Sequence, residues 1–170
     1  MFDKEIKITG KHANYVTKLS SKFGNTTAKF FDRNVDVYIQ ASIIGFLFQN
    51  KKSIDASSDD TAHIFRDQVL KCKQDLEFNK QVILLLDKEY EPDEAKRIDK
   101  AFRNFGKDKS DIELFEAYVR GGIEILYEKL IENASTSDDY VQKLCVFTDE
   151  INERYNSKVD MIQLQNLLNK

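Results

Sequence analysis

NVDVYIQASIIGFLF, residues 34–48, is the stretch of this sequence that decides the fold. Its apolar side chains lie almost all round a helix, and a helix of that kind is buried on every side. We therefore predict a central buried helix here, although the run Val35–Ile39, taken alone, also fits a strand. Gly45 within the stretch predicts a place where a second backbone comes close.

Toward the N-terminus, residues 4–9 alternate charged and apolar side chains, which predicts a short strand. A lone strand is not stable in water, so this one needs a partner strand, from a second copy of the chain or from another protein. A helix should follow from about Lys11 to Phe23, because Gly24-Asn25 is a typical helix end.

Toward the C-terminus, the apolar periodicity of helices continues to the end of the chain. A long helix is expected from the cap residues Ser57–Asp59 to about Lys88, with a break near Gln74 or Asp75. Later helices are expected to begin near Pro92, at Ser110, after the linker 134–139, and at Ser157.

Gly121 and Gly122 stand in the middle of the helix that begins at Ser110. The pair costs a helix about 2 kcal/mol relative to two alanines, at about 1 kcal/mol each. It therefore marks either a kink or a close contact, and we favour contact with a neighbouring helix or with a partner.

The totals place the chain among mainly α proteins. It has 170 residues, 41% of them hydrophobic and 32% charged, with one proline and six glycines. This fits a single-domain multi-helix bundle, 1–170, with one short N-terminal β-strand: a basic portion 1–52, central helices 57–133 and C-terminal helices 137–170. Neither a signal peptide nor an apolar run of about 20 residues is visible, so a cytoplasmic location without membrane contact is expected.

Motifs that carry chemistry are missing from the sequence. His12 and His63 have no partner at metal-ligand spacing, and Cys72 and Cys145 are expected to be buried thiols. There is no phosphate-binding loop and no Gly-x-Ser-x-Gly elbow. We therefore expect a non-enzymatic protein without a cofactor; the remaining enzyme hypothesis is a composite site at a subunit junction.

Three surfaces are predicted to bind protein partners, in a homo- or hetero-oligomer. They are the N-terminal strand, the glycine pair with the arginine before it, and the amphipathic C-terminal segment, which could also pack on its own domain. The residues are Ile6, Ile8, Arg120, Gly121, Gly122, Leu164, Leu167 and Leu168.

The distribution of charge supports a second hypothesis. Through Lys52 the chain has nine Lys or Arg against four Asp or Glu, a charge of +5, and the remainder carries −8. Such a split is typical either of a solvated face or of a surface for an acidic partner such as DNA, which would be bound through its phosphates. The residues for that contact are Lys4, Lys7, Lys11, Lys18, Lys22, Lys29 and Arg33.

Two stretches carry a resemblance to a known family. NVDVYIQASIIGF, residues 34–46, resembles a segment with Asp-Val, an alanine and an apolar-Gly-Phe end, and LFEAYVRGGIEIL, residues 114–126, is similar to a Phe-Glu-x-Tyr-x-x-Gly-Gly-apolar-Glu signature. Both occur in small proteins associated with Dnd-type DNA phosphorothioation systems. Over residues 30–130 the resemblance implies an accessory subunit or adaptor of a complex in bacterial antiviral defence, and it carries over no catalytic residues.

Overall fold

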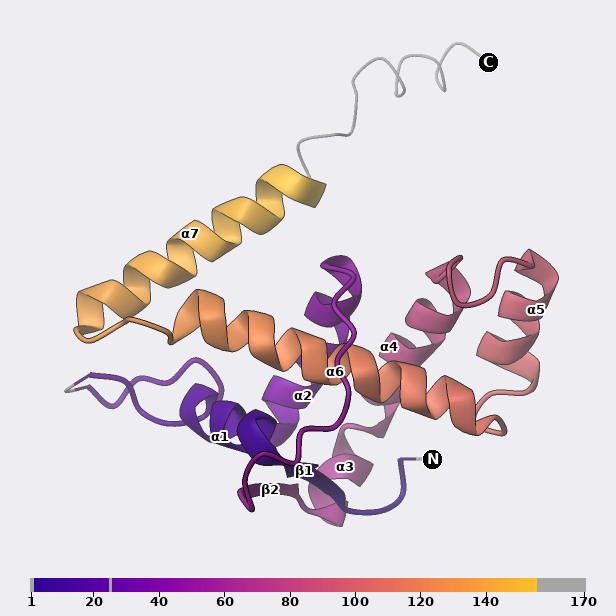
Figure 1. Ribbon diagram of the computed structural model, residues 1–170, viewed down its shortest axis with the longest axis horizontal. Coiled ribbons are helices and arrows are strands. Elements are labelled where there is room, and N and C mark those ends of the chain that lie inside the picture. Colours follow the sequence, from indigo (N-terminus) through magenta and orange to yellow (C-terminus); the bar gives the residue numbers. More distant parts are fainter. Residues whose placement is uncertain (1, 25, 156–170) are drawn as a thin grey trace, which may run out of the picture.

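A central pair of packed helices organises the molecule. The computed structural model describes residues 2–24 and 26–155, and in it α2 (Asn34–Leu47) lies against α6 (Lys109–Leu130), which runs across the middle of Figure 1. Phe115 and Tyr118 of α6 are fully buried, as is Val35 of α2. The predicted central buried helix and the mainly α fold are confirmed.

Glycines allow the two helix backbones to come close together. A Cβ atom added to Gly45 would collide with the carbonyl oxygen of Tyr118, and one added to Gly122 would collide with that of Ala41. Helix α6 continues through the glycine pair: Gly122 allows the close contact with α2, and Gly121 allows one with Asn50 in the segment after α2. Of the two predicted alternatives, kink and contact, the structure has the contact.

The N-terminal strand β1 (Ile6–Thr9) finds its partner inside the chain. It pairs antiparallel with β2 (Thr61–Ile64), with Ile6 opposite Ile64. The prediction of a partner strand from a second copy or another protein was therefore wrong, and so was the helix predicted over residues 61–64. Alternate side chains of β2 are buried, which is the pattern of a half-covered strand.

The other helices follow the predicted order with shifted ends. Cys72, and not Gln74 or Asp75, separates α3 from α4, and Phe23 lies beyond the end of α1. Asp93 caps α5 by accepting a hydrogen bond from the Lys96 backbone N–H at 3.1 Å. The bounds are α1 (Gly10–Leu19), α3 (Arg66–Lys71), α4 (Lys73–Leu86), α5 (Glu94–Ile98) and the π-helix η1 (Asp99–Arg103).

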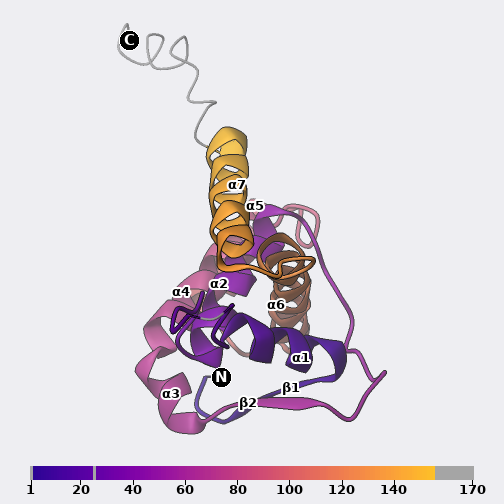
Figure 2. The ribbon, with the colours of Figure 1, turned by 90° about the vertical axis from the view of Figure 1, so that its left-hand side faces the viewer.

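Helix α7 (Ser137–Tyr155) completes the described part of the chain. It follows α6 after a short turn and diverges from it in Figure 1, and in Figure 2 it rises away from α1 and the strands. The helix predicted from Ser157 lies outside the described residues. Within the described ranges, none of the helices has the length and apolarity that crossing a membrane requires.

Candidate protein-binding groove

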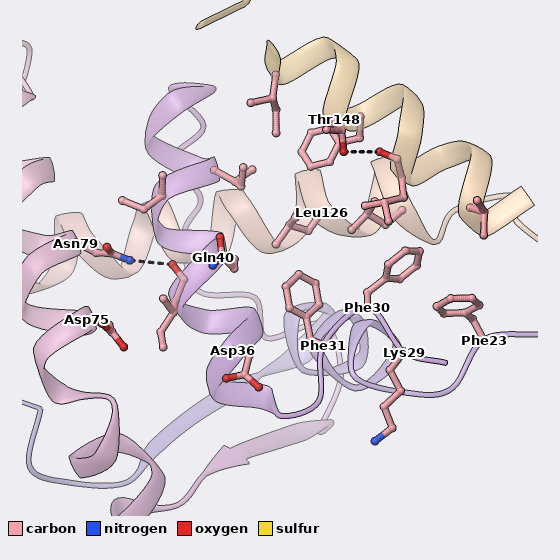
Figure 3. A pocket seen from close by; sticks show the side chains of 18 of the residues that line it. Phe23, Lys29, Phe30, Phe31, Asp36, Gln40, Asp75, Asn79, Leu126 and Thr148 are labelled. Atoms are coloured by element: carbon pink, nitrogen blue, oxygen red, sulfur yellow. Dashed lines mark hydrogen bonds between the residues drawn. The ribbon is translucent and has the colours of Figure 1, made fainter. Parts of the chain in front are cut away.

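The divergence of α7 from α6 leaves an apolar groove. Its volume is about 780 Å³, and it lies between α7 and the elements α2, α4 and α6 (Figure 3). Phe23, Phe30 and Phe31, from the segment before α2, point into it from below. The other apolar side chains that line it are Ile39, Ile43, Ile44, Phe78, Leu126, Leu130, Val141, Leu144, Phe147 and Ile151.

Helix α7 forms one wall and is attached to the body at both of its ends: the Tyr140 ring packs against Phe23, and the Tyr155 hydroxyl donates to the Leu47 carbonyl oxygen. Phe147 is buried, and Lys129 of α6 forms an ion pair of 2.8 Å with Glu150. Val141 and Leu144 line the groove yet remain 55% and 44% exposed. The helix is thus fixed to the body while part of its apolar face stays in water.

The opposite wall is supplied by α4 and α2. Phe78 on α4 lines the groove with 64% of its surface exposed. Next to it, Asn79 donates a hydrogen bond of 3.1 Å to the Ile39 carbonyl oxygen (Figure 3) and one of 3.0 Å to the hydroxyl of Ser42, and both tie α4 to α2. Asp36 and Asp75 stand on this side of the groove and Lys29 at the other end, so its rim is polar.

The side chains that line the groove are mainly apolar. In residues 2–24 and 26–155 there is no group of three His, Cys, Asp or Glu side chains that could hold a metal ion. Exposed apolar side chains that lie together and are framed by polar residues are found at interaction sites.

The three surfaces predicted from the sequence do not coincide with the groove in the part of the chain that the structure describes. Ile8 is buried and Ile6 half-buried at the β1–β2 pair. Arg120 donates from Nε to the carbonyl oxygen of Lys52 at 2.8 Å, and Gly121 and Gly122 are buried. The structure does not bring these two surfaces together with the groove. Leu164, Leu167 and Leu168 lie outside the described residues.

The predicted basic residues are all exposed, but several are already paired. Lys11 forms an ion pair of 2.9 Å with Glu124, and Arg33 one of 2.6 Å with Asp36. Lys18 donates a hydrogen bond of 3.3 Å to the Tyr127 hydroxyl. The exposed set is Lys4, Lys7, Lys11, Lys18, Lys22, Lys29 and Arg33. The two ion pairs, of Lys11 and Arg33, reduce the positive charge that this face would offer to phosphates.

Sequence reasoning missed the groove because it placed the apolar residues of α4 and α7 on buried faces and predicted partner binding at other residues. Phe78, Val141 and Leu144 all belong to predicted apolar patterns, and nothing in their spacing separates them from buried neighbours such as Leu76. The burial expected of Cys145 was also wrong: Cys72 is buried and Cys145 is exposed on α7. A helix pattern identifies the apolar face but not what covers it.

Fold and groove together define a small, mainly helical protein with an open apolar groove. The chain belongs to the family described as DNA sulphur modification system-associated protein 4, whose family model matches residues 5–164. The predicted resemblance to Dnd-associated small proteins is thereby confirmed. No curated protein and no solved structure matches the chain.

Proposed function

We propose that this protein is a non-enzymatic accessory subunit of a DNA sulphur modification system in antiviral defence, and that its groove binds an amphipathic helix of another protein of that system. The observation that carries the proposal is the exposure of Phe78, Val141 and Leu144 on facing walls of one groove. Membership of the modification-associated family supplies the setting.

A helix is the partner element that suits this geometry. An amphipathic helix places apolar side chains at positions i, i+3, i+4 and i+7, and these can enter a groove lined by aliphatic and aromatic residues. Burial of apolar surface contributes about 25 cal/mol per Å², so covering three large exposed side chains gives a favourable contact. Asp75 at the rim favours a lysine or arginine beside the apolar stripe of the partner.

A matched pair of substitutions on α7 tests the proposal. Leu144 lines the groove, whereas Val146 is 59% exposed on the same helix and does not line it. The full chain is co-expressed with the other proteins of its modification system, and affinity for the co-purified component is measured by calorimetry. We expect Leu144→Asp to weaken binding at least tenfold, because it places an unpaired charge in an apolar contact.

Val146→Asp is the control and should leave the affinity within about twofold of the unsubstituted chain, since surface changes outside a contact have small effects. Equal losses in the two variants would place the contact elsewhere on α7. If no protein of the system co-purifies with the chain, the adaptor proposal fails.

The second candidate function is DNA binding through the basic N-terminal portion. It is favoured by the exposure of all seven predicted cations. Fluorescence anisotropy with duplex DNA across salt concentrations tests it, because phosphate-led binding weakens steeply as salt rises. Replacing Lys4, Lys7 and Lys29 with glutamine should then flatten the salt dependence. Absence of binding at about 50 mM salt would rule this function out.

A further inference from the structure

Strand β1 has a second edge, which no strand in the described part of the chain covers. Its partner β2 occupies one edge of the two-stranded sheet and leaves the other open. The backbone N–H of Gly10 donates to the carbonyl oxygen of Asp60 at 3.0 Å, so these two residues form a hydrogen-bonded pair that continues the ladder. Such pairs alternate along an antiparallel ladder. Ile6 and Ile8 therefore bond to β2, and the backbone N–H and C=O of Lys7 point away from it.

The two edges of the sheet are covered to different extents. On the β2 edge, the residue opposite Lys7 is His63, whose carbonyl oxygen accepts a hydrogen bond of 3.2 Å from the Asn34 side chain. On the β1 edge, neither backbone group of Lys7 forms a hydrogen bond with another described residue. A strand edge with an unpaired N–H and C=O is a template for a further strand.

A second, smaller cavity runs along this open edge. Its volume is about 240 Å³, and it shares no lining residue with the groove. All four residues of β1, Ile6–Thr9, line it, and no residue of β2 does. Successive side chains of a strand point to opposite faces, so a cavity over one face would be lined by alternate residues. Lining by four residues in a row places the cavity beside the edge of β1.

The segment after α2 closes one end of this cavity and adds apolar surface to it. The segment crosses α6 (Figure 1) and reaches the end of β1, where the Asp55 carbonyl oxygen accepts a hydrogen bond of 3.3 Å from the Thr9 hydroxyl. Ile54 of the segment lines the cavity with 70% of its surface exposed, and Ile6 of β1 lines it half-buried. An added strand could cover both isoleucines.

The side chain of Lys7 sets the charge that the open edge favours. It is exposed and forms no ion pair within the described ranges. Its cross-strand neighbour His63 is engaged with Glu5 at 2.7 Å. The Glu116 and Arg120 side chains of the cavity lie 3.7 Å apart and offset each other. Because opposite charges on facing residues stabilise paired strands, the incoming residue beside Lys7 should be acidic.

We propose that the open edge of β1 binds an extended segment of another protein, which adds to the sheet as a third, antiparallel strand with the alternation apolar–acidic–apolar. The acidic residue lies opposite Lys7 and exchanges two backbone hydrogen bonds with it, and the antiparallel order gives the more stable ladder. The cavity is smaller than the range of about 300–1,000 Å³ that drug-sized ligands occupy, which suits a strand that enters by its backbone. The site is independent of the groove, and its test needs no protein of the modification system.

A capped peptide, Ac-Thr-Val-Glu-Val-Thr-NH2, is titrated into the ¹⁵N-labelled full chain. We expect a saturable shift of the Lys7 backbone amide resonance and slower exchange of that amide with solvent, because its N–H becomes hydrogen-bonded. The matched control peptide carries N-methylglutamate, which keeps the side chains and removes the N–H that donates to the Lys7 carbonyl oxygen. It should bind about five- to tenfold more weakly, the effect of one lost hydrogen bond.

Three results of this titration would overturn the proposal. The first is a Lys7 amide that does not respond to the peptide at millimolar concentration, or that responds equally to the N-methylated one. The second is a set of saturable shifts in α4 and α7, which would place the peptide in the groove. The third is a Lys7 amide that shifts on dilution of the chain alone, which would assign the edge to a second copy.

A charge reversal tests the position of the acidic residue. Lys7→Glu should weaken binding of the glutamate peptide about three- to fivefold and strengthen binding of Ac-Thr-Val-Lys-Val-Thr-NH2 by a similar factor. Lys4→Glu makes the same change at an exposed residue that does not line the cavity, and both affinities should stay within about twofold. A preference between the two peptides that is the same in Lys7→Glu and the unsubstituted chain would contradict the proposed pairing.

Discussion

The contact between α2 and α6 and the groove between α4 and α7 are made from similar apolar helix faces, but one is closed and the other open. At the first, Gly45 and Gly122 let two backbones touch. At the second, Phe78 and Leu144 face each other across a gap and remain partly in water. The glycines lie where two helices of the chain pack directly against each other. The large exposed side chains lie where the described part of the chain leaves an apolar helix face partly uncovered.

The largest expected effect is at the closed contact. Gly122→Ala should lower the free energy of unfolding by about 3 kcal/mol, because the new methyl group collides with the Ala41 carbonyl oxygen. Helix propensity alone predicts the opposite sign, a gain of about 1 kcal/mol. Urea denaturation measures the difference. Ala95→Val, on the exposed surface of α5, is the control and should change stability by a few tenths of a kcal/mol.

A somewhat smaller loss is expected from a buried hydrogen bond of α6. The Tyr118 hydroxyl donates to Oδ2 of Asp87 at 2.7 Å, and the Asp87 side chain is 1% exposed. Tyr118→Phe leaves this buried carboxylate without its closest donor and should cost about 2 kcal/mol in chemical denaturation. Tyr140→Phe removes a longer, partly exposed hydrogen bond to Ala134 and should cost less than about 0.5 kcal/mol. Equal losses of stability in the two variants would show that the burial of the Tyr118 hydrogen bond does not determine its contribution to stability.

The pH dependence of stability should report the packing of α1 on α6. Burial lowers the pKa of His12 in the folded chain below its ordinary value of 6.5. The unfolded chain therefore binds a proton first, and stability falls as the pH is lowered from about 6.5. The Glu124 pKa is also lowered from 4.5, so a further loss follows in more acid solution, as its carboxylate takes up a proton.

Thermal unfolding between pH 7.5 and 5 measures this slope. His12→Asn should flatten the upper part of the curve, because it removes the group whose pKa is lowered by burial. If the slope is unchanged in His12→Asn, the pH dependence of stability between pH 7.5 and 5 does not come from His12.

The smallest effect on stability is expected in the groove. Phe78→Ser should change the free energy of unfolding of the isolated chain by less than about 0.5 kcal/mol, because most of this side chain is already in water. Phe102→Ser changes a similarly exposed phenylalanine outside the groove. It is the control when partner binding by Phe78→Ser is measured. A loss of 2 kcal/mol or more at Phe78 would mean that the groove is closed in solution.

The same comparison explains what could be predicted from the sequence. The burial of residues 34–48 could be predicted, because a helix that is apolar all round must be buried. The close contact at the glycine pair could be predicted as well, because glycine is unfavourable inside a helix unless a contact requires it. The strand at Thr61–Ile64 was missed, since four residues before a helix carry too short a pattern to separate from the helix itself.

The hydrogen bond of His12 and the candidate groove were harder to predict for a different reason. His12 and Glu124 are 112 residues apart in the sequence, and only the packing of α1 on α6 brings them together. Leu144 and Val146 are both apolar residues of one helix, and only the position of α7 places the first in the groove. Local patterns contain neither kind of information.

Hydrogen–deuterium exchange of the full chain, alone and in complex with the component that co-purifies with it, tests the groove most directly. The account predicts that binding slows exchange in α4 and α7, on both walls of the groove, and leaves β1 and α1 unchanged. Slower exchange confined to β1 and α1, with α4 and α7 unaffected, would contradict it.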